Sequence, residues 1–223
     1  VSEAVPQERT VTVASPVGFS TFDPFLAPAP SIDYLRPVYD SLVIKRGLDR
    51  YEPGLTQSFS FDESMKIFRL KLRDGVYFSD GVPLNAQAVK ANFEHGRGVK
   101  RSSWASVYAN IETIETPAAD EVILRLKSPD PTLLESLQAM PGMMVSPAAL
   151  VNPASLAVYP VGVGPWKLDP DHTIIGERHT YIPAQNYWDS SVQQFGNYVL
   201  LHISDAAARV NALRNGQLDI TPI

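Results

Sequence analysis

Residues 61–90 constrain the fold more than any other stretch, because they predict a strand, two tight turns and the start of a helix in close succession. Apolar and charged side chains alternate along 66–73, and this period of two is typical of a strand with one buried face. Asp-Gly pairs at 74–75 and 80–81 predict turns, because glycine adopts the positive backbone angles that tight turns need. Asn85 predicts a helix start, since its side chain can accept a hydrogen bond from a free backbone N–H.

The rest of the sequence alternates predicted strands and helices without a detectable internal repeat, so we expect a mixed α/β fold. Pro37 lies inside the apolar stripe of the first predicted helix, and because proline lacks a backbone N–H it should kink or shorten that helix. The last predicted helix should end at Gly216. The predicted strands cover 9–14, 66–73, 76–78, 111–115, 121–126, 173–181, 198–203 and 218–221, and the predicted helices begin at Ser31, Asn85, Pro131 and Asp205.

Length, charge and cysteine content narrow the classes of function. A chain of 223 residues should bury roughly 70% of its unfolded surface, enough for a substantial core. The net charge of −5 argues against binding to nucleic acid, which requires a basic face. The sequence contains no cysteine, which excludes disulfides and thiolate metal ligands. No apolar run is long enough to predict a membrane span, and residues 1–9 are too polar for a signal peptide.

Catalytic and metal-binding motifs are not found. The four histidines lack the spacing of helical zinc sites, so we expect them at the surface or at strand edges. No Gly-x-Ser-x-Gly elbow for a serine nucleophile occurs. Gly162 and Gly164 lack the third glycine of a dinucleotide loop, and we expect them instead to let two backbone segments pass closely. We therefore expect no cofactor and no catalysed reaction. The histidines are His95, His172, His179 and His202.

Several short motifs occur in a fixed order along almost the whole chain. They are Phe-Asp-Pro at 22–24, Tyr-Asp-Ser-Leu at 39–42, Glu-Pro-Gly-Leu-Thr-Gln-Ser at 52–58, Gly-Val-Gly-Pro-Trp at 162–166, Asn-Tyr-Trp at 186–188, and a pattern with Leu213, Gly216 and Asp219 within 208–219. Together with the 61–90 stretch, this order resembles that of the family 5 solute-binding proteins, the extracytoplasmic peptide- and nickel-type receptors of ABC importers.

The resemblance implies a periplasmic-binding-protein-like first lobe, with a mixed sheet and an inserted smaller α/β subdomain. Residues 1–48 and 162–223 would form the core of the lobe and residues 49–161 the inserted subdomain. The second lobe of the family is absent from this chain. The resemblance also implies a location in the periplasm or outside the cell, with a removed export signal and a lipid anchor as one option.

The resemblance further implies that the first lobe supplies one wall of a ligand cleft. The loop at 27–32 and the segment with Trp104 and Tyr108 are expected to face that cleft, with burial in the core as the alternative for Trp104. Met143 stands where relatives that take chelates or carboxylates place an arginine, which favours an apolar or peptide-like solute; a core position is its alternative. The expected ligand-binding residues are Ala27, Pro28, Ala29, Pro30, Ile32, Trp104, Tyr108 and Met143.

The implied function is capture of a small solute, foremost a short peptide, for delivery to an ABC permease in the membrane. A nickel or metal-chelate receptor of the same family is the alternative. A periplasmic enzyme or a sensor module built on the same lobe is a third possibility. Because a later segment would normally complete the lobe, we also expect this truncated lobe to self-associate through the face left uncovered.

Overall fold

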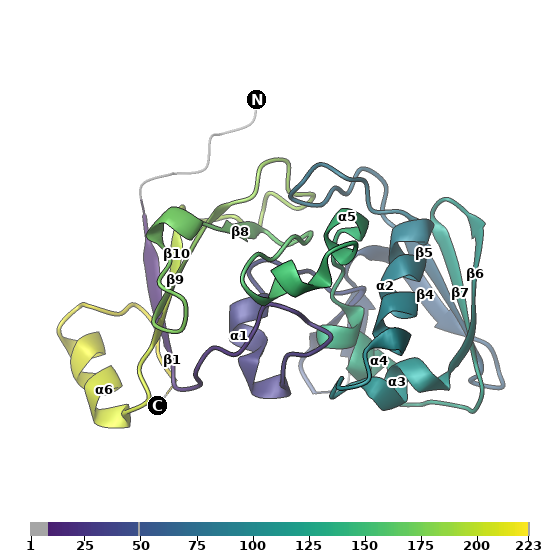
Figure 1. Cartoon of the computed structure of the whole chain (residues 1–223), viewed down its shortest axis with the longest axis horizontal. Coiled ribbons are helices and arrows are strands. Elements are labelled where there is room, and N and C mark those ends of the chain that lie inside the picture. The colour runs from purple at the N-terminus through teal and green to yellow at the C-terminus, as the bar shows by residue number, and fades with distance from the viewer. Residues whose placement is uncertain (1–8, 49, 223) are drawn as a thin grey trace.

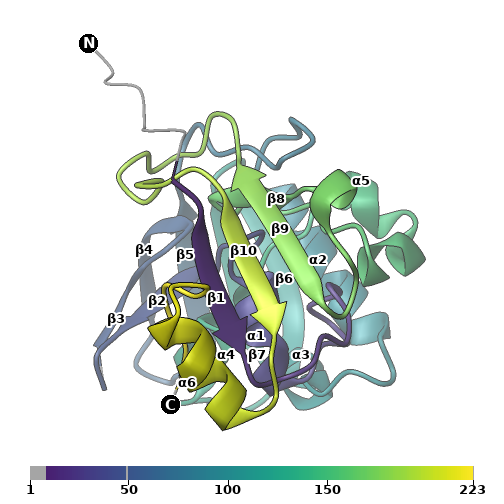
Figure 2. The same cartoon turned by 90° about the vertical axis from the view of Figure 1, so that its left-hand side faces the viewer.

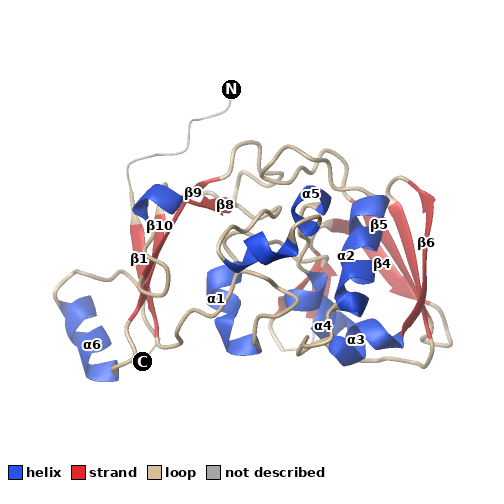
Figure 3. Cartoon of the chain, in the orientation of Figure 1, coloured by secondary structure: helices blue, strands red, loops and turns tan. Residues whose placement is uncertain are grey.

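The computed structural model describes residues 9–48 and 50–222, which form two β-sheets at opposite ends of an elongated molecule (Figure 1). Most of the helices lie between the two sheets, as the colouring by secondary structure shows in Figure 3. The helix α6 (Ala206–Arg214) is different, because it lies on the outer side of the first sheet. The helices between the sheets contribute buried apolar side chains, such as Leu35, Phe93 and Leu137, to the core.

The first sheet is mixed, with strand order β1-β10-β9-β8 (Figure 2). The edge strand β1 runs parallel to β10, whereas the other pairs are antiparallel. On the free edge of β1, Val13 forms a single parallel bridge with Ile220, so the end of the described chain returns to this sheet. The strands are β1 (Val11–Ser15), β8 (Trp166–Leu168), β9 (Arg178–Pro183) and β10 (Tyr198–His202).

The second sheet is antiparallel throughout, with strand order β4-β5-β7-β6. Phe68, Leu70 and Leu72 of β5 are buried while Arg69 between them is exposed, which confirms the predicted alternation. A separate pair, β2 and β3, connects the regions of the two sheets. The strands are β2 (Val43–Arg46), β3 (Arg50–Pro53), β4 (Thr56–Phe61), β5 (Ile67–Leu72), β6 (Ile111–Ala118) and β7 (Glu121–Leu126).

The predicted ends of two helices are confirmed. Asn85 accepts a hydrogen bond from the Ala88 amide at 2.9 Å and so begins α2. Asp205 accepts one from Ala208 at 2.7 Å at the start of α6, and Gly216 follows that helix with a φ of 70°. The remaining helices are α1 (Ile32–Leu35), α3 (Ala105–Asn110), α4 (Leu133–Leu137) and α5 (Pro147–Leu150), and α2 covers Ala86–Gly98.

Several predicted elements are shorter in the structure. Pro37 shortens the first helix as expected, because α1 ends at Leu35. The helix predicted from Pro131 divides into α4 and a 3₁₀ turn at Met140–Gly142, since Pro141 cannot continue the α-helical hydrogen bonds.

Three predicted strands also need correction. Residues 76–78 lie between two Asp-Gly turns and form only one bridge, from Tyr77 to Pro83. The strand predicted at 173–181 begins at Arg178, because a turn through Gly176, with a φ of 88°, precedes it. The strand predicted at 218–221 is reduced to the bridge at Ile220.

Residues 37–42 form a central segment that other parts of the chain enclose. The Gly164 and Trp166 amides donate to the Val38 and Pro37 carbonyls, at 3.0 and 2.9 Å. A Cβ atom on Gly164 would lie 2.5 Å from the Pro37 carbonyl oxygen, and one on Gly162 would overlap the Val38 carbonyl. Both glycines are therefore needed for the close approach that the sequence predicted.

The strands of the first sheet fall within 1–48 and 162–223, and those of the second within 49–161. The β2–β3 pair crosses the boundary at residue 48. The division into a core lobe and an inserted subdomain at these boundaries is retained as a proposal.

His179 of β9 is a buried residue, so the expectation of surface or strand-edge histidines is wrong at this position. Its ring lies within 4.6, 5.6 and 5.0 Å of the rings of Phe19, Phe22 and Tyr34. Burial among these rings disfavours the charged imidazolium and lowers the pKa of His179 to about 4. Local sequence does not predict this, because the burial of a histidine depends on contacts with distant segments.

Gly96 of α2 permits close packing against α3. A Cβ atom at this position would lie 2.6 Å from ring atoms of Tyr108, which is itself buried. Gly98, two residues later, is exposed and has no heavy atom within 4 Å of the corresponding position. Substitution by alanine adds the same methyl group at both glycines. At Gly96 this methyl group meets a packed ring, and at Gly98 it meets no neighbouring atom.

The first prediction uses this pair. Gly96→Ala should destabilise the fold by roughly 1–3 kcal/mol, because the added methyl group overpacks a core that cannot shift freely. Gly98→Ala should be neutral or slightly stabilising, since alanine is favoured over glycine in helices. Urea unfolding of both variants measures the difference, and equal effects would contradict the packing of Tyr108 over Gly96.

The second prediction concerns pH. The unfolded chain should protonate His179 as the pH falls below about 6.5, whereas the folded chain resists until about pH 4. As the pH falls from 6.5 to 4, the free energy of unfolding should therefore decrease by roughly 2–3 kcal/mol relative to His179→Phe. Urea unfolding at pH 7 and pH 4.5 tests this, with His202→Gln, an exposed position, as the control. Parallel pH profiles for the wild type and His179→Phe would show that His179 is not responsible.

Candidate functional site

The loop expected to face a ligand presents a rigid apolar rim. Pro28, Ala29 and Pro30 are exposed, whereas Ala27 is buried and Ile32 is half-buried. A 3₁₀ turn at Ala29–Ser31 fixes the rim, and the two prolines carry no backbone N–H. The exposed part of the expected site on this loop is therefore Pro28–Pro30 and the edge of Ile32.

Asp23 organises the base of the same loop. Its carboxylate accepts a hydrogen bond from the Phe25 amide at 2.8 Å, and its backbone carbonyl accepts those of Leu26 and Ala27. Burial raises the pKa of Asp23, since little water reaches the carboxylate. The loop is thus closed on itself by short-range hydrogen bonds.

The ring of Phe25 joins this loop to the two helices that carry the other expected site residues. It lies edge-on to His95 of α2, with ring centroids 4.7 Å apart, and 6.1 Å from the ring of Tyr108 of α3. The loop that carries the rim therefore packs against the helix that begins at Trp104.

Trp104 is half-buried at the start of α3, and its backbone amide donates to Ser102 Oγ at 3.1 Å. Its indole Nε1 is buried and has no hydrogen-bond partner within the described part of the chain. A buried donor without an acceptor costs free energy, and because Nε1 is covered, a ligand could accept from it only after the covering residues move.

Tyr108 and Met143 lie deeper than the expected site required. Tyr108 is 1% exposed, its hydroxyl finds no partner among the described residues, and burial raises the pKa of its phenol. Met143 is also 1% exposed and forms an antiparallel bridge with Ser41, as its core alternative anticipated. In this structure neither side chain is available to a ligand at the surface, and Ala27 is buried as well.

Asp40 forms a polar cluster that was not predicted from the sequence. Its Oδ2 accepts hydrogen bonds from Tyr187 Oη at 2.6 Å and from Trp188 Nε1 at 2.9 Å. The Arg73 guanidinium lies 4.4 Å from the centre of the Trp188 ring. A cavity of about 310 Å³ adjoins the cluster. The sequence shows the motifs at 39–42 and 186–188 separately and does not indicate that they meet. The available signal was the place of Asp40 beside apolar residues, since a carboxylate there needs hydrogen-bond partners.

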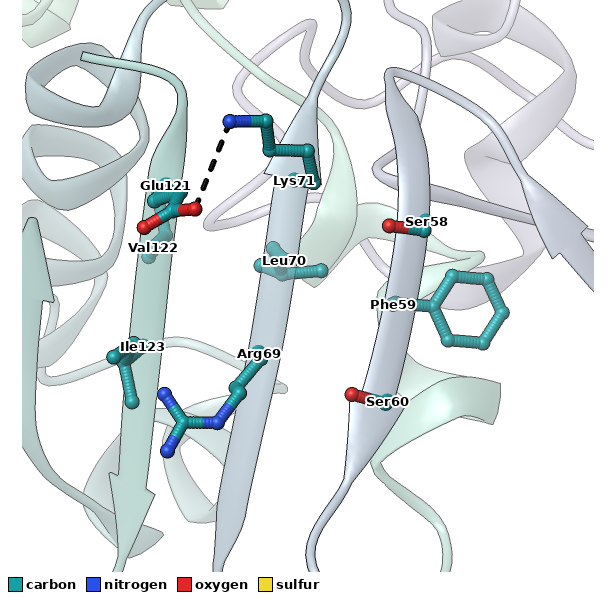
Figure 4. A pocket seen from close by; sticks show the side chains of 9 residues that line it. All are labelled: Ser58, Phe59, Ser60, Arg69, Leu70, Lys71, Glu121, Val122 and Ile123. Carbon is teal, nitrogen blue, oxygen red and sulfur yellow. Dashed lines mark ion pairs between the residues drawn. The ribbon is translucent and has the colours of Figure 1, made fainter. Parts of the chain in front are cut away.

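A second hollow of about 310 Å³ lies on the outer face of the second sheet (Figure 4). Ser58 and Ser60 of β4 are short, and they leave space beside Arg69 and Lys71 of β5. Lys71 forms ion pairs with Asp120 at 2.6 Å and with Glu121 at 3.6 Å. Because these pairs are partly exposed, they contribute little to binding or stability. We therefore interpret the hollow as a solvent-exposed face of the sheet.

Metal ligands are not clustered in the described residues: no three His, Asp or Glu side chains are grouped so that they could hold an ion. Within the same residues, none of the helices combines the length and apolar character that crossing a membrane requires. The exposed surface of the candidate site consists of the apolar rim at Pro28–Pro30 and the exposed part of Trp104.

Comparison with known proteins connects this surface to a family. The bacterial extracellular solute-binding proteins, family 5 Middle, match residues 50–223. A putative ABC transporter peptide-binding protein of Brucella ovis is 26% identical over 215 residues, which cover 92% of this chain and 40% of that protein. The nickel-binding periplasmic protein of Escherichia coli is 27% identical over 227 residues, covering 99% of this chain and 42% of that protein.

A solved structure gives the same result for the fold. The periplasmic binding protein AgaA of A. tumefaciens, in complex with agropinic acid, superimposes with a TM-score of 0.86 at 25% identity, over 96% of this chain and 43% of that one. The expected α/β fold of part of a periplasmic binding protein is thus confirmed. The chain spans about two fifths of the length of these relatives. With most of its residues matched, the chain belongs to the family 5 bacterial extracellular solute-binding proteins, which bind solutes and are not enzymes.

Proposed function

We propose that this chain forms one lobe of a receptor that captures a small solute and delivers it to an ABC permease. The support is family membership together with coverage, since the chain corresponds to 40–42% of the two relatives named above. A receptor of two lobes binds by closing on its solute, so a single lobe supplies only part of the affinity. In this proposal 1–48 and 162–223 are the core of the lobe and 49–161 the inserted subdomain.

The observation that carries the proposal is the combination of the Pro28–Pro30 rim with the unpartnered indole of Trp104. The rim offers apolar contact at little entropic cost, because its backbone is already fixed. The indole adds one directed donor, which a ligand reaches only by displacing the residues that cover it. Solute pockets typically combine apolar walls with a few such polar groups. We assign the wall to the exposed parts of 28–32 and to Trp104.

A short peptide is the ligand class that this wall favours. Its backbone carbonyls would accept from the Trp104 indole, and its side chains would lie on the proline rim. The relative named from Brucella ovis is described as peptide-binding. The relative from Escherichia coli is described as nickel-binding, which keeps a nickel or metal-chelate complex as the alternative. An organic chelate could accept from the same indole donor.

We further propose a location in the periplasm or outside the cell, with a lipid anchor as an option, in line with the extracellular family. Self-association of this lobe is proposed as well. Ile174, Ile175 and Ile220 are 57%, 46% and 57% exposed near the first sheet, and apolar surface of this kind favours contacts between molecules. A sensor or scaffold role would instead show itself as a defined partner protein.

The third prediction tests the wall. In ¹⁵N-labelled protein, a tripeptide such as Ala-Ala-Ala added to millimolar concentration should shift the indole N–H signal of Trp104. The signals of Trp166 and Trp188 should stay in place, because these indoles already donate to Gly196 and Asp40. They therefore act as internal controls, and a matched titration with Ni²⁺ examines the alternative ligand.

The variant Trp104→Phe separates the effect of the indole N–H on peptide binding from its effect on the stability of the fold. The variant keeps an aromatic ring but loses the N–H, so peptide affinity should fall by roughly 2- to 10-fold, the range of one hydrogen bond. The free energy of unfolding should change by less than about 1 kcal/mol. A loss of about 3 kcal/mol or more with unchanged affinity would assign Trp104 to the core, and a response to Ni²⁺ alone would overturn the peptide assignment.

A further inference from the structure

A third hollow, of about 220 Å³, is lined by residues of α1, β8 and β10 and of the chain next to them. No residue of the Pro28–Pro30 rim lines it, and neither does Trp104. It shares only Arg36 with the cavity beside Asp40. Pockets for drug-sized ligands measure about 300–1,000 Å³, so this hollow suits a smaller molecule. Its lining residues are Asp33, Arg36, Pro37, Trp166, Phe195 and Tyr198.

Aromatic rings form the apolar side of this hollow. The rings of Trp166 and Phe195 are stacked, with centroids 4.8 Å apart and an angle of 18° between their planes. The Tyr198 ring lies 6.3 Å from that of Trp166 and 6.4 Å from that of Phe195. Phe195 and Tyr198 are half-buried, so part of each side chain is open to a bound molecule. Aromatic side chains offer a large apolar contact area to such a molecule.

Hydrogen bonds fix the position of the aromatic side. Trp166 Nε1 donates to the Gly196 carbonyl at 3.0 Å, and the Trp166 amide donates to the Pro37 carbonyl at 2.9 Å. Gln193 Nε2 donates to the Pro165 carbonyl at 2.6 Å. The rings are therefore held in place without a ligand, and binding requires little further ordering of the protein.

Two opposite charges line the same hollow from α1. Asp33 lies within the helix and Arg36 is the residue that ends it, a separation that places side chains on one face of a helix. Both residues are exposed, and within the described part of the chain neither side chain has a hydrogen-bond or ion-pair partner. A carboxylate and a guanidinium group are thus both available beside the aromatic rings.

This pair of charges selects the class of ligand. A simple anion would be attracted by Arg36 and repelled by Asp33, and a simple cation would meet the reverse, whereas a molecule with both charges is attracted by both. An α-amino acid carries its ammonium and carboxylate groups on one carbon atom, and its side chain points away from them. This arrangement matches two charges on one helix face next to an apolar surface.

We propose that the hollow is a second ligand site, which binds a free α-amino acid with an apolar or aromatic side chain. The ammonium group pairs with Asp33, the carboxylate pairs with Arg36, and the side chain lies against Phe195 and Tyr198. Because the hollow is small and its ion pairs are exposed, the affinity is only about millimolar. The site is separate from the wall at 28–32 and does not depend on the identity of the transported solute.

The fourth prediction follows the backbone amide signals of the whole ¹⁵N-labelled chain during titration with L-phenylalanine. The signals of Arg36, Phe195 and Tyr198 should shift and reach saturation, because these residues line the hollow. Phenylpropionate lacks the ammonium group, phenethylamine lacks the carboxylate, and glycine lacks the side chain. Each of these should bind at least about threefold more weakly than L-phenylalanine, since each loses one of the three contacts.

Two variants assign each charge of the ligand to its partner. Asp33→Asn should weaken the binding of L-phenylalanine and phenethylamine but not that of phenylpropionate. Arg36→Gln should weaken the binding of L-phenylalanine and phenylpropionate but not that of phenethylamine. Arg214→Gln removes an exposed cation of α6 that does not line the hollow, so this control should bind all three compounds as the wild type does.

Three results would overturn the proposal. The absence of a saturable shift at L-phenylalanine concentrations well above millimolar would show that the hollow does not bind an amino acid. Equal binding of L-phenylalanine and any of the three comparison compounds would show that the corresponding contact is not made. Shifts confined to Ala29 and Trp104 would place the amino acid on the solute wall, which supports that wall and contradicts a second site. The compound series uses the wild type alone, so it decides the matter even if a variant fails to fold.

Discussion

The arrangement of the molecule depends on the backbone hydrogen bonds that enclose residues 37–42. On one side, the Leu42 amide donates to the Gly142 carbonyl at 2.9 Å, and the Met144 amide donates to the Asp40 carbonyl at 3.3 Å. On the other side, the amides of Gly164 and Trp166 donate to the carbonyls of Val38 and Pro37. A central segment with partners on both sides satisfies buried backbone groups that would otherwise be costly. It also fixes the first sheet relative to the second.

This central segment links the candidate wall to the polar cluster at Asp40. The chain leaves the rim at 28–32, forms α1, and enters the enclosed segment at Pro37, so the rim is attached to the most constrained part of the core. Asp40 lies within this segment, where it accepts the hydrogen bond of Tyr187. The wall retains a polar group that burial disfavours, the unpartnered indole donor of Trp104. Such groups reduce stability, and they mark positions where a ligand can have a large effect.

Local patterns predicted the features that neighbouring residues decide. The alternation of β5, the Asn85 start of α2 and the shortening by Pro37 depend on a few adjacent residues. Burial of His179, Tyr108 and Met143 depends on segments far away in the sequence, so it was not predicted for His179 and Tyr108, and for Met143 it was left as an alternative. The contact between Asp40 and Trp188 spans 148 residues, and neither motif alone indicates it. The resemblance gave the family and the fold, whereas side-chain roles required the contacts.

Native-state hydrogen exchange of the Gly164 and Trp166 amides tests most directly whether the central segment holds the two sheets together. If it does, these two amides should exchange only through global unfolding and should be as protected as the most protected amides of β5 and β10. Their denaturant dependence should equal that of the whole molecule. If both amides exchange much faster while the strands of each sheet stay protected, the sheets are stable independently and the enclosed segment is not the constraint on which the structure depends.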